Sequence, residues 1–322
     1  MTIISAPEQY NTERLFVDLR TIVGHSLYLK IEGMNFAGSV KLKAATEMVD
    51  TAERDGTLRP GSIIIESSSG NLGVALAMIS ASRGYEFVCV TDARCNLPTR
   101  QLMQALGARV VVITEPAPDG GLLGARMDYV RTQLANDPRY VWLNQYSNPA
   151  AWQAHYNTTG PQIAAEFAHV DVVFVGAGTT GTLMGIARYF ADHHPHVKVI
   201  AVDAAGSVTF GGPAKPRMIP GLGTSVRPAH TDETYLADII HVEEPDTITT
   251  CHQLAARGML FGGSTGTVVS GATTWLNDND PNHELVSVCL APDMGERYLD
   301  TIYNTHWVND VYGDIKTDLV AA

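Results

Sequence analysis

Short runs of β-branched and other apolar residues recur along the 322-residue chain. Six of these runs predict buried strands, at residues 62–66, 86–92, 109–113, 171–175, 197–203 and 284–290. Between them, apolar residues recur at helical spacing, as in residues 71–84, 98–108 and 159–168. Alternation of strand and helix is typical of βαβ units, in which helices cover mostly parallel, buried sheets. The pattern therefore predicts an α/β fold.

Two segments interrupt this alternation. Residues 144–157 (NQYSNPAAWQAHYN) are rich in polar and turn-forming residues, and we expect a boundary there, with strand–helix units on each side. Residues 204–232 are rich in Gly and Pro. A loop of that length in a compact enzyme more often forms a lid or a substrate wall than a linker.

Composition narrows the class of protein. The chain is 45% hydrophobic and 17% charged, which suits a globular enzyme of one or two domains. Its net charge of −12 argues against a nucleic-acid partner, and its scattered Lys and Arg residues argue against a membrane surface. The N-terminus lacks a signal pattern and no apolar segment is long enough to span a bilayer. We therefore expect a soluble, cytoplasmic protein.

The four cysteines form no CxxC pair and show no metal-ligand spacing, so no metal site is expected. Cys89 and Cys289 lie inside apolar runs. We expect both to be small core residues without a redox role.

The turn Gly176–Gly181 (GAGTTG) matches G-x-G-x-x-G between a predicted strand and a predicted helix. The next strand ends at Asp203, about where the ribose-binding acid of a dinucleotide site would fall. The turn also carries hydroxyls at Thr179, Thr180 and Thr182, and such donors suit a terminal phosphate better than a pyrophosphate. Three alternatives stay open here: a nicotinamide dinucleotide, a smaller phosphate-bearing cofactor, or a tight turn without a ligand.

The segment Gly262–Gly266 (GGSTG) fits G-x-S-x-G, the nucleophile elbow of serine hydrolases. Acids and histidines that could complete a triad follow it, namely Asp278, Asp280, Asp293, His283 and His306. However, no apolar strand leads into the turn, which disfavours a hydrolase.

The segment Ser67–Gly73 (SSSGNLG) follows a predicted strand and opens a predicted helix. Its backbone N–H groups and small hydroxyls at a helix N-terminus are suited to bind a carboxylate. The alternative is an ordinary helix cap.

Lys41 lies just inside a predicted helix start, after the Gly-Ser turn of NFAGSVKLKAATEM. The positive end of the helix dipole disfavours a charged amine, so a neutral, nucleophilic lysine is easier to obtain there. The alternative is a solvated surface lysine, which we expect Lys43 to be.

Seven segments, GSVK, SSSGN, NQYSNPA, TTGP, GAGTTGT, GGSTG and GERYLD, occur in the order and spacing of the cysteine synthase group of fold-type II pyridoxal phosphate enzymes. The chain resembles this group from about residue 27 to residue 300. The resemblance implies a tryptophan synthase β-like fold with two open, twisted, mostly parallel sheets flanked by helices. It further implies a smaller, mobile substrate-binding domain at residues 42–148, a larger domain that binds the cofactor phosphate at residues 1–41 plus 149–322, and a homodimer.

The same resemblance implies pyridoxal 5′-phosphate as cofactor and Lys41 as its Schiff-base lysine. Asn71 would bond the ring oxygen, and Ser264 would face the pyridine nitrogen. A neutral serine there favours β-elimination over transamination. The phosphate cup would consist of Gly178, Thr179, Thr180, Gly181 and Thr182. The substrate α-carboxylate would be held by Ser68, Ser69, Gly70 and Gln145.

The implied reaction is β-replacement on an activated serine with small amino acids as substrates. Lys41 would remove the Cα proton and the Cβ group would leave, which gives an aminoacrylate intermediate to which a second nucleophile adds.

Several segments depart from the cysteine synthase pattern. Leu42 and Lys43 follow Lys41 where the family has an aspartate and an arginine, and the N-terminal I-G-N-T-P segment is missing. Instead, EPAPDGGLLGAR, WLNQYSN, IPGLGTS and APDMGERYLD resemble the N-(2-amino-2-carboxyethyl)-L-glutamate synthases. Those transferases use O-phospho-L-serine and L-glutamate, release phosphate, and make a diaminopropionate precursor for siderophores and antibiotics. A cysteine synthase using O-acetyl- or O-phospho-L-serine and sulfide is the alternative.

A dianionic leaving group and a dicarboxylate nucleophile both need cations in the pocket. Arg126 is our candidate for glutamate and Arg217 for phosphate, with Tyr146 as a wall of the second-substrate pocket; salt bridges are the alternative for each arginine. A non-enzymatic binding module is a third class, which a reactive Lys41 disfavours. If the turn binds pyridoxal phosphate, Asp203 is interpreted as a residue at the end of a strand and not as a ribose ligand.

Overall fold

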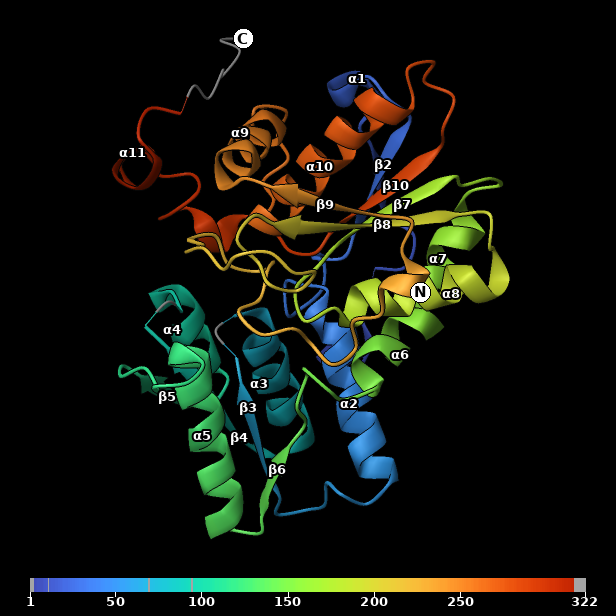
Figure 1. Ribbon diagram of the computed structural model, residues 1–322. Helices are drawn as coiled ribbons and strands as arrows, with labels where there is room; N and C mark the ends of the chain where they lie inside the picture. The colour runs from blue at the N-terminus through green and yellow to red at the C-terminus, as the bar shows by residue number, and fades with distance from the viewer. Residues whose placement is uncertain (1–2, 11, 69, 94, 316–322) are drawn as a thin grey trace.

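The computed structural model describes residues 3–10, 12–68, 70–93 and 95–315. Two sheets organise these residues, one in the upper half and one in the lower half of Figure 1. The larger sheet has six strands in the order β1-β2-β10-β7-β8-β9. Its strands are Phe16–Asp18, Leu27–Ile31, Ser287–Ala291, Val172–Gly176, Lys198–Ala204 and Asp238–Val242. Only the edge pair β1 and β2 is antiparallel within this sheet.

The smaller sheet has four parallel strands in the order β5-β4-β3-β6. These strands are Arg109–Ile113, Glu86–Asp92, Ile63–Ser67 and Tyr140–Trp142. Two mostly parallel sheets flanked by helices confirm the predicted fold class. The strands of the four-stranded sheet fall within residues 42–148 and those of the six-stranded sheet fall outside, but the two domain boundaries remain a prediction.

Helices cover both sheets, because parallel strands need crossover connections and bury both faces. Those of the first half are α1 (Arg20–Val23), α2 (Lys41–Arg54), α3 (Asn71–Arg83), α4 (Leu97–Ala105) and α5 (Gly121–Asn136). Those of the second half are α6 (Ala150–Asn157), α7 (Thr159–Glu166), α8 (Gly181–His193), α9 (Glu244–Ala255), α10 (Gly263–Asn279) and α11 (Thr305–Tyr312). Short 3₁₀ turns lie at Pro7–Gln9, Glu233–Tyr235 and Glu296–Tyr298.

All six predicted strands are present, and β4 and β5 have the predicted bounds. The apolar pattern did not predict the short strands β1, β2, β6 and β9. Within the expected boundary at 144–157, residues 150–157 form helix α6, which the turn-rich composition did not predict, and the boundary itself remains a prediction. There, Ala150, Ala151 and Ala154 are buried and form a small-residue face that packs against neighbouring helices.

The apolar core follows the two sheets. One buried cluster joins α2 and α3 to the four-stranded sheet, and two others lie on the six-stranded sheet. Cys89 and Cys289 are fully buried in these clusters, as predicted. None of the helices in the described ranges is long and apolar enough to cross a membrane.

Candidate active site

Lys41 is the first residue of α2 and reaches the turn between β7 and α8. Its Nζ donates to Thr179 Oγ1 at 3.2 Å. One cavity is lined by Lys41, Gln145, Thr179, Gly181 and Thr182 together with apolar side chains. Burial of the amine lowers the pKa of Lys41 to about 8, while the negative charge of Glu66 opposes this. The predicted nucleophile and the predicted phosphate turn therefore share one site.

The turn before Lys41 is held by Asn35. Its Oδ1 accepts from the Ala37 N–H at 3.0 Å, and its Nδ2 donates to the carbonyls of Glu32 and Ser39 at 3.0 and 2.9 Å. Gly38 adopts a positive φ of 68°, which other residues rarely adopt. This local bonding explains why the chain starts a helix at Lys41.

The turn Gly176–Gly181 brings backbone and hydroxyl groups together at the start of α8. Thr180, the residue before the helix, has a φ of 62°, and its Oγ1 lies 3.3 Å from Thr231 Oγ1. A Cβ at Gly178 would lie 2.7 Å from the Gly221 carbonyl oxygen, so the close backbone approach requires glycine there. A helix N-terminus with threonine hydroxyls and a neighbouring lysine fits a phosphate monoester.

The serine segment caps α3. Ser68 Oγ accepts from the backbone N–H of Gly73 at 3.0 Å and of Gly70 at 3.4 Å. Gln145 is buried beside it and donates to the Ser67 carbonyl at 3.2 Å. Ser68 therefore satisfies a first-turn N–H of α3 although Gly70 is the N-cap residue, and the carboxylate-binding role remains a prediction. Ser69 lies outside the described residues.

The Asn71 amide is held by residues close to the end of the six-stranded sheet. Its Nδ2 donates to Asp293 Oδ2 at 2.8 Å, and its Oδ1 accepts from Arg297 Nη1 at 2.5 Å. Tyr298 also donates to Asp293, and burial raises the pKa of that carboxyl. The motif GERYLD contains Arg297 and Tyr298, but the sequence pattern assigned neither a role. Their position just after a buried strand was the available signal.

Ser264 is buried near the N-terminus of α10. The Gly221 backbone packs so closely over its Oγ that a Cβ on residue 221 would collide with it. Ser264 lines a second cavity with Leu222 and Thr267 among others. Before α10 the described chain forms an isolated bridge at Phe261 rather than a strand, so this serine lacks the strand–turn–helix setting of a nucleophile elbow.

The two candidate arginines have protein partners. Arg126 is buried on α5, with its Nε 3.3 Å from Asp92 Oδ2. Burial raises the pKa of the nearby Tyr146 hydroxyl, and the Arg126 charge opposes this. Arg217 donates to the Gly206 carbonyl and, at 3.4 Å, to Ser225 Oγ, both within the 204–232 segment. Arg126 thus forms the salt bridge that we considered as its alternative role. The substrate-binding roles of both arginines remain predictions.

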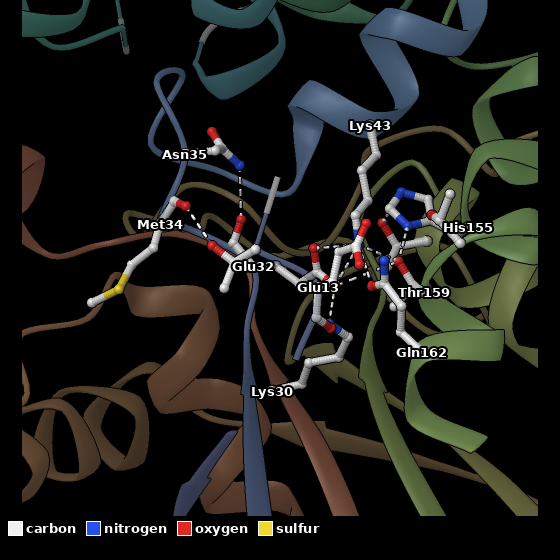
Figure 2. Close-up of polar contacts among 12 residues, drawn as sticks. Glu13, Lys30, Glu32, Met34, Asn35, Lys43, His155, Thr159 and Gln162 are labelled. Atoms are coloured by element: carbon white, nitrogen blue, oxygen red, sulfur yellow. Dashed lines mark hydrogen bonds and ion pairs between the residues drawn. The ribbon is translucent and has the colours of Figure 1, made fainter. Parts of the chain in front are cut away.

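The expectation for Lys43 was wrong. Its side chain is buried, and its Nζ lies 2.8 Å from the Glu32 carboxylate. Figure 2 shows the two side chains pointing toward each other. The amphipathic pattern of a helix does not reveal a buried acid on another element. Asp203 is buried at the end of strand β8, where a pyridoxal site led us to expect it. Its Oδ1 accepts from the Ala204 N–H at 2.8 Å.

The 204–232 segment has little regular secondary structure and packs against the site. Gly223 N–H donates to the Ala177 carbonyl at 2.8 Å, and Ala229 N–H donates to the Tyr146 carbonyl at 3.2 Å. It therefore contacts both the phosphate turn and the segment after β6, a position suited to a substrate wall.

Comparisons with known proteins agree with this geometry. Residues 12–293 match the family model described as pyridoxal-phosphate dependent enzyme. The chain is 38% identical to an N-(2-amino-2-carboxyethyl)-L-glutamate synthase of Ralstonia nicotianae, over 88% of this chain and 83% of that one. It is 37% identical to an enzyme of the same name from Cupriavidus metallidurans, over 91% and 87%. The O-acetylserine dependent cystathionine beta-synthase of Helicobacter pylori is similar in structure, with a TM-score of 0.86, 25% identity and coverage of 94% and 100%.

Proposed function

The chain belongs to the pyridoxal-phosphate-dependent enzyme family, and from this premise we propose that it makes N-(2-amino-2-carboxyethyl)-L-glutamate. The reaction is a β-replacement in which L-glutamate displaces the phosphate of O-phospho-L-serine. The observation that carries the proposal is the cavity that Lys41 lines together with Thr179, Gly181 and Thr182. The two relatives that bear this product's name, each more than a third identical to the chain, support the choice of product.

Lys41 is the base of this proposal. Bound pyridoxal phosphate supplies the electron sink that makes the substrate Cα proton acidic. Since burial lowers the pKa of Lys41 to about 8, its amine can take that proton and return it near neutral pH. We assign the cofactor phosphate to the turn that contains Thr179, Thr180 and Thr182.

The N-terminus of α3 holds the substrate α-carboxylate in the proposal. Ser68 caps the helix through its oxygen, so its hydroxyl proton is still available to an anion. Gln145 and Gly70 lie beside it, and Ser69 is assigned from the family resemblance. Asn71 is assigned to the cofactor ring oxygen, and Ser264 is assigned to the pyridine nitrogen as a neutral partner.

The second substrate brings two carboxylates, of which we assign the side-chain one to Arg126 and Tyr146. Arg126 is buried, and its Nη1 has no hydrogen-bond partner among the described residues. Asp92 balances its charge, so a glutamate carboxylate would compete with or share that contact. Arg217 is assigned to the leaving phosphate. It lies in the 204–232 segment, which forms a wall of the substrate pocket in this proposal.

The test measures phosphate release from O-phospho-L-serine by the pyridoxal-phosphate-loaded protein with and without L-glutamate, with product detection by mass. Release that depends on L-glutamate and yields N-(2-amino-2-carboxyethyl)-L-glutamate supports the proposal. Equal or faster turnover of O-acetylserine with sulfide would overturn it in favour of a cysteine synthase. The H. pylori structure shows why this control is needed, because an O-acetylserine dependent enzyme has a similar fold.

We further propose a cytoplasmic homodimer whose product supplies diaminopropionate for a siderophore or an antibiotic. The family resemblance supports these assignments, together with a mobile smaller domain at residues 42–148. Sedimentation of the holoenzyme tests the dimer, which a monomer at micromolar concentration would contradict.

A further inference from the structure

Three charged side chains are buried together beneath the phosphate turn. Lys30, Glu32 and Lys43 are each at most 6% exposed. Glu32 lies 3.0 Å from the Lys30 ammonium and 2.8 Å from the Lys43 ammonium (Figure 2). Two cations therefore share one carboxylate. Buried charges are costly unless each is paired and hydrogen-bonded, so the remaining partners of the two lysines matter.

Lys43 has three N–H donors and three partner residues. These are the Glu32 carboxylate at 2.8 Å, Gln162 Oε1 at 2.9 Å and Thr159 Oγ1 at 3.1 Å. An ammonium can only donate, so Thr159 Oγ1 accepts. The single Thr159 proton then goes to His155 Nδ1 at 2.9 Å in preference to Glu32 Oε1 at 3.5 Å. Hence Nδ1 of His155 is the acceptor.

His155 remains neutral in this setting. It is fully buried, and its pKa lies well below its usual value because of burial and, next, because of the charge of Lys43. A neutral imidazole carries one N–H, which must be on Nε2 when Nδ1 accepts. Nε2 lies 3.2 Å from Thr182 Oγ1 and donates to it. The hydroxyl proton of Thr182 is then available to the cavity that Thr182 lines.

Backbone packing holds His155 in this place. Helix α6 approaches α8 at Gly185, where an added Cβ would lie 2.7 Å from His155 Cβ and would collide with the Trp152 carbonyl oxygen. Thr182 and Gly185 are three residues apart and share this face of α8. The close contact therefore places the imidazole directly against Thr182.

We propose that Lys43, Thr159 and His155 form a directed hydrogen-bond relay that orients the Thr182 hydroxyl as a donor to the cofactor phosphate. His155 is thereby a positioning residue. The proposal rests on the assignment of the cofactor phosphate to the Thr179–Thr182 turn, and it is independent of the identity of the second substrate.

The test is a double-mutant cycle on cofactor binding, measured by titration of the cofactor-free protein with pyridoxal phosphate. We expect His155→Leu and Thr182→Val each to raise Kd about tenfold, the effect of one hydrogen bond to a charged group. The double variant should bind no worse than Thr182→Val alone, because both changes remove the same donor. His155→Gln, whose amide can donate from the Nε2 position, should retain affinity within about threefold.

Pyridoxal without its phosphate is the matched probe. The losses should vanish with pyridoxal, since the relay acts on the phosphate alone. Additive losses in the cycle, or equal losses with pyridoxal, would overturn the proposal. If His155→Leu does not fold, Thr159→Val replaces it in the cycle, because it breaks the relay with little change in volume. Thr273→Val in α10 is the matched control. No substrate is present in these titrations, so failure of the glutamate reaction leaves their result interpretable.

Discussion

At the scale of single residues, burial lowers the pKa of Lys41, and its amine contacts Thr179 in the candidate phosphate turn. An amine with a pKa of about 8 is about one-tenth neutral at pH 7, whereas an ordinary lysine is neutral in about one molecule in 3,000. We expect the rate of pyridoxal phosphate incorporation into cofactor-free protein to rise about tenfold from pH 6 to pH 7 and to level off above about pH 9. Stopped-flow absorbance follows the reaction.

An Nα-acetyllysine amide in solution is the control for that profile, because its amine has no burial. A protein rate that keeps rising to pH 10.5 like that of the control would contradict the depressed pKa. Lys41→Ala should lose the absorption band of the Schiff base between lysine and cofactor.

Glu66 lies fully buried at the end of β3, and burial raises its pKa to about 7 from 4.5. The folded protein therefore binds a proton between these values that the unfolded chain has released, and stability falls as pH rises through this window. The difference corresponds to about 3 kcal/mol. From pH 4.5 to pH 8, we expect wild-type protein to lose about that much unfolding free energy relative to Glu66→Gln. Urea unfolding at each pH measures it, and Glu115→Gln on the surface, which keeps Glu66, should lose stability with rising pH as the wild-type protein does.

At the scale of elements, two glycines of α8, Gly181 and Gly185, face the backbone of α6, and the approach is tighter at Gly185. Gly185→Ala should push the helices apart and lower the free energy of unfolding by about 1–3 kcal/mol, the usual cost of overpacking. It should also weaken pyridoxal phosphate binding, because His155 moves from Thr182. Urea unfolding and cofactor titration check both effects. Ser82→Ala on the exposed face of α3 is the control, and equal behaviour of the two variants would refute the steric argument.

The contact between α6 and α8 also shows which kind of helix the apolar sequence pattern does not predict. Short β-branched runs predicted six strands because burial on both faces leaves a near-continuous apolar pattern. The sequence pattern did not predict helix α6, because a buried face of alanines carries little apolar signal. Only the partner helix shows why small residues occur there.

At the scale of the whole molecule, Arg297 joins segments from distant parts of the chain. Its Nη1 and Nη2 donate to Asn71 Oδ1 at 2.5 Å and to the Ala37 carbonyl at 2.6 Å. Arg297→Ala should speed amide hydrogen exchange about tenfold in the first turn of α3 and around Ala37, because each loses a charged partner. Exchange in β7 and β8 should not change. Arg139→Ala, which removes a contact with Asp137 and a charge interaction with Glu86 on the surface, is the control. Unchanged exchange at both sites in Arg297→Ala would contradict the inference.

The sequence by itself determined the α/β class and singled out the candidate lysine and the candidate phosphate turn. Strand periodicity, a Gly-rich turn and a helix start are local properties that neighbouring residues impose on the backbone. The family resemblance rested on such local segments and named the cofactor, which the comparisons support.

Only the tertiary structure decided how these parts meet. Lys41 and Thr179 are 138 positions apart, and Asn71 and Asp293 are 222 apart, so no local pattern can predict either contact. The burial of Lys43 and the relay through His155 depend on which helices touch, and that depends on backbone approach at Gly185. Charge and hydrogen-bond direction at the site follow from these long-range contacts, because burial makes every donor and acceptor need a partner.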